Sequence, residues 1–83
     1  MERNQSIVEV DLHGCTVVQA QVAIDAALKR SRSAYRIRLI HGYTRGHALR
    51  DMIRSRYGKH PKVIRLEMGL NPGETDLVLR ELF

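Results

Sequence analysis

The sequence has a single cysteine, no tryptophan, two prolines and no long apolar run among its 83 residues. One cysteine cannot form an internal disulfide, so nothing in the composition points to an oxidising compartment. Apolar runs stay far below the ~18–20 residues that a membrane span requires, and the first residues lack the apolar core of a signal peptide. We therefore expect a cytoplasmic protein with no membrane partner.

Acidic residues are scarce relative to basic ones. Nine Asp and Glu stand against fourteen Lys and Arg, which gives a formal net charge of +5 and a pI of about 10.0. Eleven of the basic residues are arginine, whose planar guanidinium group suits phosphate. This balance favours nucleic acid as the partner. A basic protein with no polyanionic partner is the alternative.

Apolar and polar residues alternate over residues 7–13, which predicts a half-buried strand. Thr16 and Gln19 have the spacing of a capping box, which predicts the start of a helix that runs into the basic segment 29–32. The other expected elements are a strand over 35–40, a helix with Leu49, Met52, Ile53 and Tyr57 on its buried stripe that ends at Gly58, and strands over 63–70 and 75–82.

These elements predict one two-layer α/β domain over residues 7–83, after a tail at 1–6, because a chain of this length has room for one core. The order β-α-β-α-β-β predicts a four-stranded mixed sheet with both helices on one face. Right-handed crossovers return each strand parallel to the one before, so the carboxyl ends of the first three strands should share an edge. The loops DLHGCT, HGYTRG and LNPGET then meet where ligands of open α/β sheets bind.

Asp11 and His13 stand at the end of the first expected strand. Side chains at i and i+2 of a strand share a face, so a carboxylate and an imidazole are expected side by side. A carboxylate can orient a histidine that moves a proton near neutral pH. The alternative is that Asp11 caps a local turn and His13 is a solvated surface residue.

The loop HGYTRG leads directly into the second helix. Unpaired backbone N–H groups at a helix start attract anions, and Arg45 and Arg50 add charge for a phosphate. Strict alternation places His41 on the core face, so this histidine either lines the site or supports it. The alternative is a glycine-lined turn beside a solvated helix face. The candidate nucleic-acid contacts are His41, Gly42, Arg45, Gly46, Arg50 and Arg54.

No metal or cofactor site is indicated by the motifs. A P-loop sequence is missing, and one assured carboxylate, with Glu74 uncertain, is too few for a two-metal phosphodiesterase. The spacing matches no closed zinc pattern among the conceivable ligands Asp11, His13, Cys15 and His41. We therefore expect neither a metal nor another cofactor. If the edge does not bind nucleic acid, the open sheet face is the next candidate surface, with Arg36, Arg38 and Arg65.

Several short motifs occur in a specific order: Val10-Asp11-Leu12-His13-Gly14, Thr16, Ile40-His41-Gly42 with Gly46, Leu49-Arg50, His60-Pro61 and Gly73-Glu74-Thr75. In this order they resemble the Smr (small MutS-related) domain family over nearly the whole chain. The resemblance implies a fold similar to the C-terminal domain of bacterial translation initiation factor three, and nuclease activity on DNA or RNA. It also implies that Asp11 and His13 are catalytic. Members of the family are linked to DNA recombination and to mRNA cleavage at stalled ribosomes.

Two loops depart from the family pattern, with Thr44 in place of a glycine and residues 71–75 in place of a second glycine-rich run. Less glycine restricts the close approach of backbone to a phosphate. The leading hypothesis is an endonuclease that cleaves RNA, including mRNA on the ribosome, or that nicks DNA. The alternative is a non-catalytic module that binds RNA, the ribosome or branched DNA. The substrate and the oligomeric state stay open.

Overall fold

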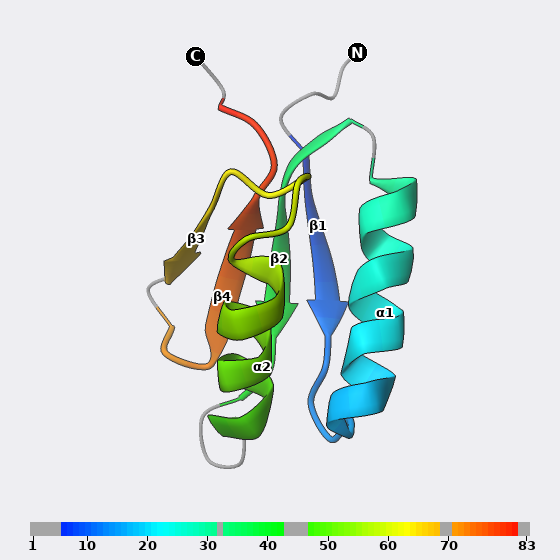
Figure 1. The fold of residues 1–83 in the computed structure, drawn as a ribbon, viewed down its shortest axis with the longest axis vertical. Helices are drawn as coiled ribbons and strands as arrows, with labels where there is room; N and C mark the ends of the chain where they lie inside the picture. The colour runs from blue at the N-terminus through cyan, green and yellow to red at the C-terminus, as the bar shows by residue number, and fades with distance from the viewer. Residues whose placement is uncertain (1–5, 32, 43–46, 69–70, 82–83) are drawn as a thin grey trace.

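The computed structural model describes residues 6–31, 33–42, 47–68 and 71–81 (Figure 1). The elements follow one another as β1 (Ser6–Asp11), α1 (Val17–Arg30), β2 (Ala34–Ile40), α2 (His47–Tyr57), β3 (Arg65–Met68) and β4 (Glu74–Val78). This order confirms the expected β-α-β-α-β-β arrangement. No helix in these described ranges is long and apolar enough to cross a membrane.

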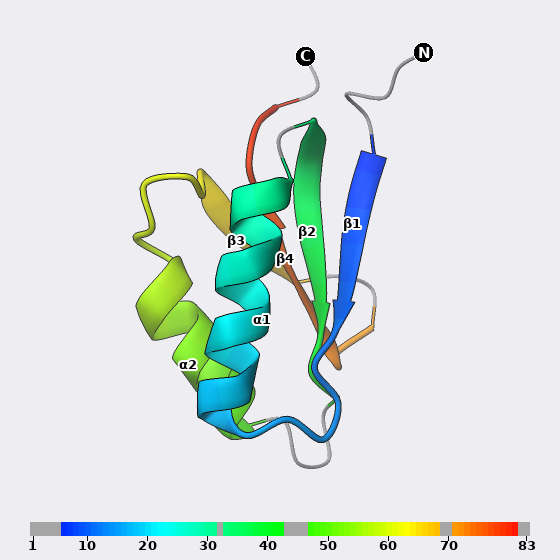
Figure 2. The same cartoon turned by 90° about the vertical axis from the view of Figure 1, so that its right-hand side faces the viewer.

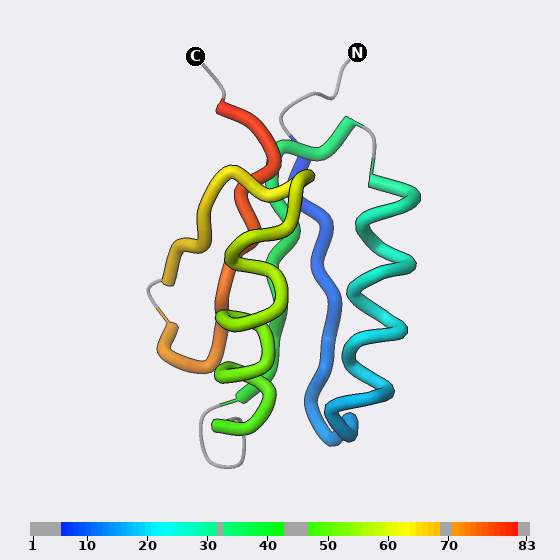
Figure 3. The backbone as a smooth tube through the Cα atoms, viewed as in Figure 1, coloured from blue at the N-terminus to red at the C-terminus, as the bar shows by residue number. Residues whose placement is uncertain are grey.

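The four strands form one mixed sheet in the order β1-β2-β4-β3. β1 pairs parallel with β2, whereas β4 pairs antiparallel with both β2 and β3. β3 therefore runs in the same direction as β2, as expected, but β4 lies between them. Both helices cover one face of the sheet (Figure 2). The ends of β1 and β2 and the start of β4 meet at one edge, at the bottom of Figure 3.

α1 begins at the predicted capping box. The Gln19 backbone N–H donates to Thr16 Oγ1 over 3.1 Å, and the Thr16 N–H donates to Gln19 Oε1 over 2.9 Å. These two bonds satisfy backbone donors that have no partner inside the helix. The predicted stripe of α2 is buried at Leu49, Met52, Ile53 and Tyr57, and α1 buries Ala20, Ile24, Ala27 and Leu28.

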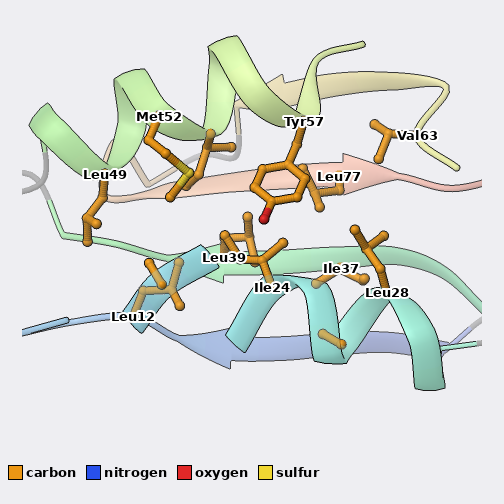
Figure 4. Close-up of a cluster of buried hydrophobic side chains, with 13 residues drawn as sticks. Leu12, Ile24, Leu28, Ile37, Leu39, Leu49, Met52, Tyr57, Val63 and Leu77 are labelled. Atoms are coloured by element: carbon orange, nitrogen blue, oxygen red, sulfur yellow. The ribbon is translucent and has the colours of Figure 1, made fainter. Parts of the chain in front are cut away.

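The core lies between the helices and the sheet (Figure 4). The centre of the core contains Leu12, just after β1, and Ile37 and Leu39 of β2. Ile24 of α1 and Leu77 of β4 belong to the same cluster, and none of these five residues has exposed surface. Alternation places the polar neighbours of these residues on the opposite face of the sheet. The half-buried strand predicted over residues 7–13 is thus confirmed, and β2 has the same alternation.

The last two strands are shorter than expected. β3 covers Arg65–Met68 and β4 covers Glu74–Val78, against the expected 63–70 and 75–82; residues 69–70 and 82 lie outside the described ranges. Beyond Val78 the N–H groups of Leu79 and Arg80 both point to the carbonyl of Tyr35, at 2.8 and 3.3 Å. Two successive donors on one acceptor end the regular ladder.

The sheet face away from the helices carries an ion-pair network centred on Asp76. Arg36 Nη1 donates to Asp76 Oδ2 over 2.8 Å, and Arg38 donates to both carboxylate oxygens over 3.1 Å. Arg65 bonds Glu67 and Glu81 on the same face. The bonds to Asp76 raise the pKa of Arg36 and Arg38 above its usual value. All three arginines of the second candidate surface are therefore committed to carboxylates, which argues against phosphate binding there.

Candidate functional site

A hollow of about 750 Å³ opens at the carboxyl edge of β1 and β2. Its walls come from the loop after β1, the end of β2, the first turn of α2 and the loop before β4. The lining residues are His13, Gly14, Cys15, Ile40, His41, Gly42, Leu49, Asn71, Gly73 and Glu74. The prediction that the three loops meet at one edge is confirmed for their described residues.

The DLHG segment forms a tight turn whose side-chain cap is Asp11. Asp11 Oδ1 accepts the backbone N–H of His13 over 2.9 Å, and the Cys15 N–H donates to the Leu12 carbonyl over 2.9 Å. Gly14 has φ +83°, a conformation that suits glycine. Asp11 therefore holds the turn through the backbone of His13, as in the alternative considered for this pair. Within the described residues, no hydrogen bond joins the Asp11 carboxylate to the imidazole of His13.

His13 is exposed and its ring lies beside Gly42 from the neighbouring loop. A Cβ atom built on Gly42 would lie 3.9 Å from His13 Cδ2. Gly42 also has φ +78°, so its backbone is strained for other residues. Gly42, just after β2, thus lies next to the His13 imidazole.

His41 has a structural role. Its side chain is 4 % exposed, with Nδ1 2.7 Å from the Gly42 carbonyl and Nε2 2.9 Å from Thr75 Oγ1. Because a carbonyl only accepts, Nδ1 carries the proton, and in the neutral ring Nε2 accepts from the Thr75 hydroxyl. Both ring nitrogens are therefore occupied, and His41 supports the site instead of offering an open contact to a ligand.

Gly73 joins the loop before β4 to the end of β2. Its carbonyl accepts the N–H groups of both His41 and Gly42 over 2.9 Å, and its own N–H donates to Asn71 Oδ1 over 2.9 Å. A Cβ atom on Gly73 would lie 3.2 Å from Gly42 Cα, closer than backbone normally tolerates. This close approach favours glycine at position 73, because a larger residue would need Gly42 to shift.

Glu74 is a lining residue that the sequence prediction left uncertain. Its carboxylate lies 3.9 Å from Arg38 Nε and its side chain is 24 % exposed. The turn chemistry of residues 71–73 was the available signal, since it places the start of the last strand at the same edge. Asp11, in contrast, does not line the hollow among its described walls.

The predicted arginine contacts are placed less directly. Arg50 lies 2.9 Å from His47 Nδ1 through Nη2 and 3.8 Å from Asp51 Oδ1 through Nε. Arg54 points to Met68 Sδ at 3.5 Å. Neither Arg50 nor Arg54 lines the hollow. Arg45 and Gly46 lie outside the described residues.

The part of the chain that the structure describes holds no group of three or more His, Cys, Asp or Glu side chains arranged to bind a metal ion. Cys15 and His41, which were conceivable ligands, both line the hollow but have different contacts. Cys15 is a half-buried free thiol that packs against the core, and both nitrogens of His41 are engaged as described above.

Residues 10–73 match the Smr domain family. The chain belongs to this family. The structure is similar to the crystal structure of the Smr domain of Thermus thermophilus MutS2, with a TM-score of 0.79 and 34 % sequence identity over 89 % of this chain and 99 % of that chain. The comparison with curated proteins found no match. Smr domains are generally associated with nuclease activity and nucleic-acid binding.

Proposed function

We propose that this Smr domain is an RNA endonuclease in which His13 transfers the proton. The carrying observation is the contrast between two histidines at one hollow: His13 is exposed with its ring at the wall, whereas His41 is buried with both nitrogens bonded. A group that exchanges protons with a substrate must be reachable. Only the first of these two imidazoles meets that requirement.

The N-terminal end of α2 provides a place for the phosphate. Leu49, in the first turn of α2, lines the same hollow as His13. A helix N-terminus carries about half a positive charge and unpaired N–H donors, which stabilise an anion by ~0.3–1 kcal/mol at an exposed site. The phosphate would thus lie between the helix start and the imidazole, with Arg45 proposed to add its charge.

The chemistry that suits one accessible imidazole beside an anion site is transesterification. His13 takes the proton of the 2′-hydroxyl, the 2′-oxygen forms a bond to phosphorus, and the bond to the 5′-oxygen breaks. The leaving 5′-oxygen takes a proton from water, and the protonated His13 returns its proton to the hydroxide that remains. The products are a 2′,3′-cyclic phosphate and a 5′-hydroxyl, and DNA, which has no 2′-hydroxyl, is not cut this way.

Asp11 is proposed to position His13. Its carboxylate bonds the backbone N–H of His13 and so fixes the turn that presents the imidazole. A misplaced catalytic group loses much of its effect, because proton transfer depends on a near-hydrogen-bond distance to the substrate. Asp11 therefore contributes to cleavage through the geometry of residues 11–14.

A binding module without catalysis is the second candidate. It is favoured by the Asp11 contact itself, since the carboxylate accepts a bond from the main chain of His13 and forms no hydrogen bond with its ring within the described residues. The same cationic protein would then hold RNA at this edge without cutting it. Both candidates share nucleic acid as the partner and differ in the fate of the phosphodiester.

Cleavage of labelled RNA, of DNA with the same sequence, and of RNA with 2′-deoxy substitutions decides between them. We expect cleavage of RNA alone, undiminished in excess chelator, with cyclic-phosphate ends. His13→Gln should slow it by about 10²–10⁴-fold and leave RNA affinity intact. Binding by the wild type without any cut selects the binding module. Fragments with 3′-hydroxyl ends, or activity that chelator removes, contradict the mechanism.

A further inference from the structure

The end of the molecule opposite the hollow is rich in cations. α1 ends near the top of Figure 1 and the segment after α2 rises towards the same end, while the loop after β1 lies at the bottom. We call this end the far basic surface, and its cations are Lys29, Arg30, Arg56, Lys59 and Lys62. All five are exposed.

Most of these charges are not neutralised. Lys29, Arg30, Lys59 and Lys62 form no ion pair with any described residue, and Arg56 has a long contact of 3.9 Å to Asp25 Oδ2. The arginines of the open sheet face behave differently, since each is bound to at least one carboxylate. The unpaired positive charge of the described chain is thus concentrated at this end.

Helix C-termini explain a part of this arrangement but not all of it. Cations stabilise a helix C-terminus, where the partial charge is about −0.5, so two helix ends offset about one positive charge. The five cations of the far basic surface, with Asp25 as the nearby carboxylate, give this end an excess of four positive charges. About three positive charges therefore remain beyond what the helix ends require.

The surface is also shaped to receive a ligand. Two adjoining hollows of about 470 and 550 Å³ share Leu28, Lys29, Pro61 and Lys62 as walls. Ser31 lines the first hollow, is 9 % exposed, and its buried Oγ has no hydrogen-bond partner within the described residues. Because this hydroxyl is buried, it can donate only to a phosphate oxygen that enters the hollow, which Lys29 and Lys62 also line.

We propose that the far basic surface binds the phosphate backbone of a double-stranded segment in the RNA that occupies the hollow. This inference rests on the proposed function, since it assumes that the hollow takes RNA. The longest dimension of the molecule is 37 Å. An A-form RNA stem of about two turns is longer than this and can contact both ends, whereas a stem of about half a turn is shorter.

Backbone binding fits this surface better than base stacking. The ring of His60 is already stacked on Tyr57, with centroids 5.9 Å apart, and the remaining polar groups are flexible cations. Single-stranded sites instead present aromatic platforms to successive bases. The chemistry of the far basic surface is that of a phosphate contact without sequence preference.

The test compares the wild type with K29Q/K59Q/K62Q and with the charge-preserving control K29R/K59R/K62R. The probes are two labelled RNA hairpins, one with a stem of about two turns, roughly 21 base pairs, and one of about half a turn, roughly five. Affinity is measured as a function of salt. On the long stem the glutamine variant should lose about 2–3 from the slope of log K against log salt, since each phosphate contact adds about 0.9.

The short stem cannot reach both ends, so its affinity should be the same for the three proteins, and the arginine control should match the wild type on both stems. An unchanged slope on the long stem overturns the inference, and so does an equal loss on both stems. Wild-type binding to phosphatidylserine vesicles, without binding to the long stem, also overturns it and assigns the surface to membranes. None of these measurements uses cleavage, so a wild type that binds as expected but cuts nothing refutes only the endonuclease.

Discussion

His41 Nε2 lies 2.9 Å from the hydroxyl oxygen of Thr75, and this buried contact ties the end of β2 to β4 beside the hollow. Thr75 is 3 % exposed and pairs in register with Leu39. The carbonyl of Gly73 provides a second link, because it accepts the N–H groups of His41 and Gly42 just after β2. The wall of the hollow therefore depends on a side-chain bond as well as on the sheet ladder.

Replacing Thr75 by valine tests this bond. The two side chains have almost the same shape, but valine leaves Nε2 of His41 buried without a partner. Such an orphaned group costs about 1–3 kcal/mol, so urea unfolding should show a loss of that size. Thr75→Ser keeps the hydroxyl and should retain a larger part of the stability. Equal losses in the two variants would assign the effect to packing of the methyl group instead.

On the opposite face of the sheet, we expect a larger loss of stability when Asp76 is replaced. Its carboxylate is 1 % exposed and binds both Arg36 and Arg38, whose side chains are 19 % and 29 % exposed. Breaking a buried ion pair from one side costs about 3–5 kcal/mol. Because both arginines reach water, we expect the free energy of unfolding of Asp76→Leu to fall by about 2–3 kcal/mol.

The control for Asp76 is Glu67→Gln on the same face. Glu67 is 36 % exposed and pairs with Arg36 and Arg65. Exposed pairs contribute about 0–1 kcal/mol, so chemical denaturation should place this variant near the wild type. If the two variants are destabilised equally, the burial of Asp76 is not what gives it its importance.

Tyr57 links the two helices and gives a prediction for alkaline pH. Its hydroxyl donates to Asp25 Oδ1 over 2.7 Å, and burial, followed by this bond, raises the pKa of Tyr57 to about 12. The unfolded value is about 10. A raised folded pKa stabilises the fold below about pH 10, and this contribution is lost as the pH rises towards 12.

Tyr57→Phe lacks both the hydrogen bond and the titration. Near neutral pH it should be less stable than the wild type by about 0.5–1.5 kcal/mol. pH 11 is about one unit above the unfolded pKa of Tyr57. At that pH the contribution of Tyr57 to the free energy of unfolding of the wild type should have fallen by up to roughly 1.4 kcal/mol. The difference between the two proteins in urea unfolding should therefore narrow at high pH. A constant difference would mean that Tyr57 does not titrate in this range.

Much of the fold could be predicted because local patterns determine it. The alternation in β1 and β2 and the stripes of α1 and α2 identify the core residues, and the Thr16 capping box identifies the start of α1. The position of β4 between β2 and β3 was not foreseen. Alternation says which face a side chain takes, but it does not say which strand pairs with which.

The site was predicted in its location and only partly in its contacts. Right-handed crossovers bring the loops to one edge whatever their side chains do, so His13 and Gly42 were expected together. The partner of a polar group depends on the three-dimensional backbone, however. The sequence offered the turn cap by Asp11 only as an alternative and could not decide between the two roles. It also could not show that His41 bonds Thr75, 34 residues further on.

Asp11 offers the sharpest test of how this edge works, because its two possible roles respond differently to asparagine. If the side chain only holds the turn through the N–H of His13, an asparagine oxygen can accept the same bond. Asp11→Asn should then keep its melting temperature and most of its RNA cleavage. Asp11→Ala removes the cap, which should cost about 0.5–2 kcal/mol by analogy with helix caps, and should slow cleavage.

Ile24→Ala is the matched control for stability, since it lies on the buried stripe of α1 with no exposed surface and should lose about 2–5 kcal/mol. Assayed below its melting temperature, this variant should cleave RNA at close to the wild-type rate, which separates loss of stability from loss of the turn. A positioning role for Asp11 is contradicted if the Asp11→Asn protein is stable but as inactive as His13→Gln. The negative charge of Asp11 would then take part in the reaction itself, as a base or as a ligand for a metal ion.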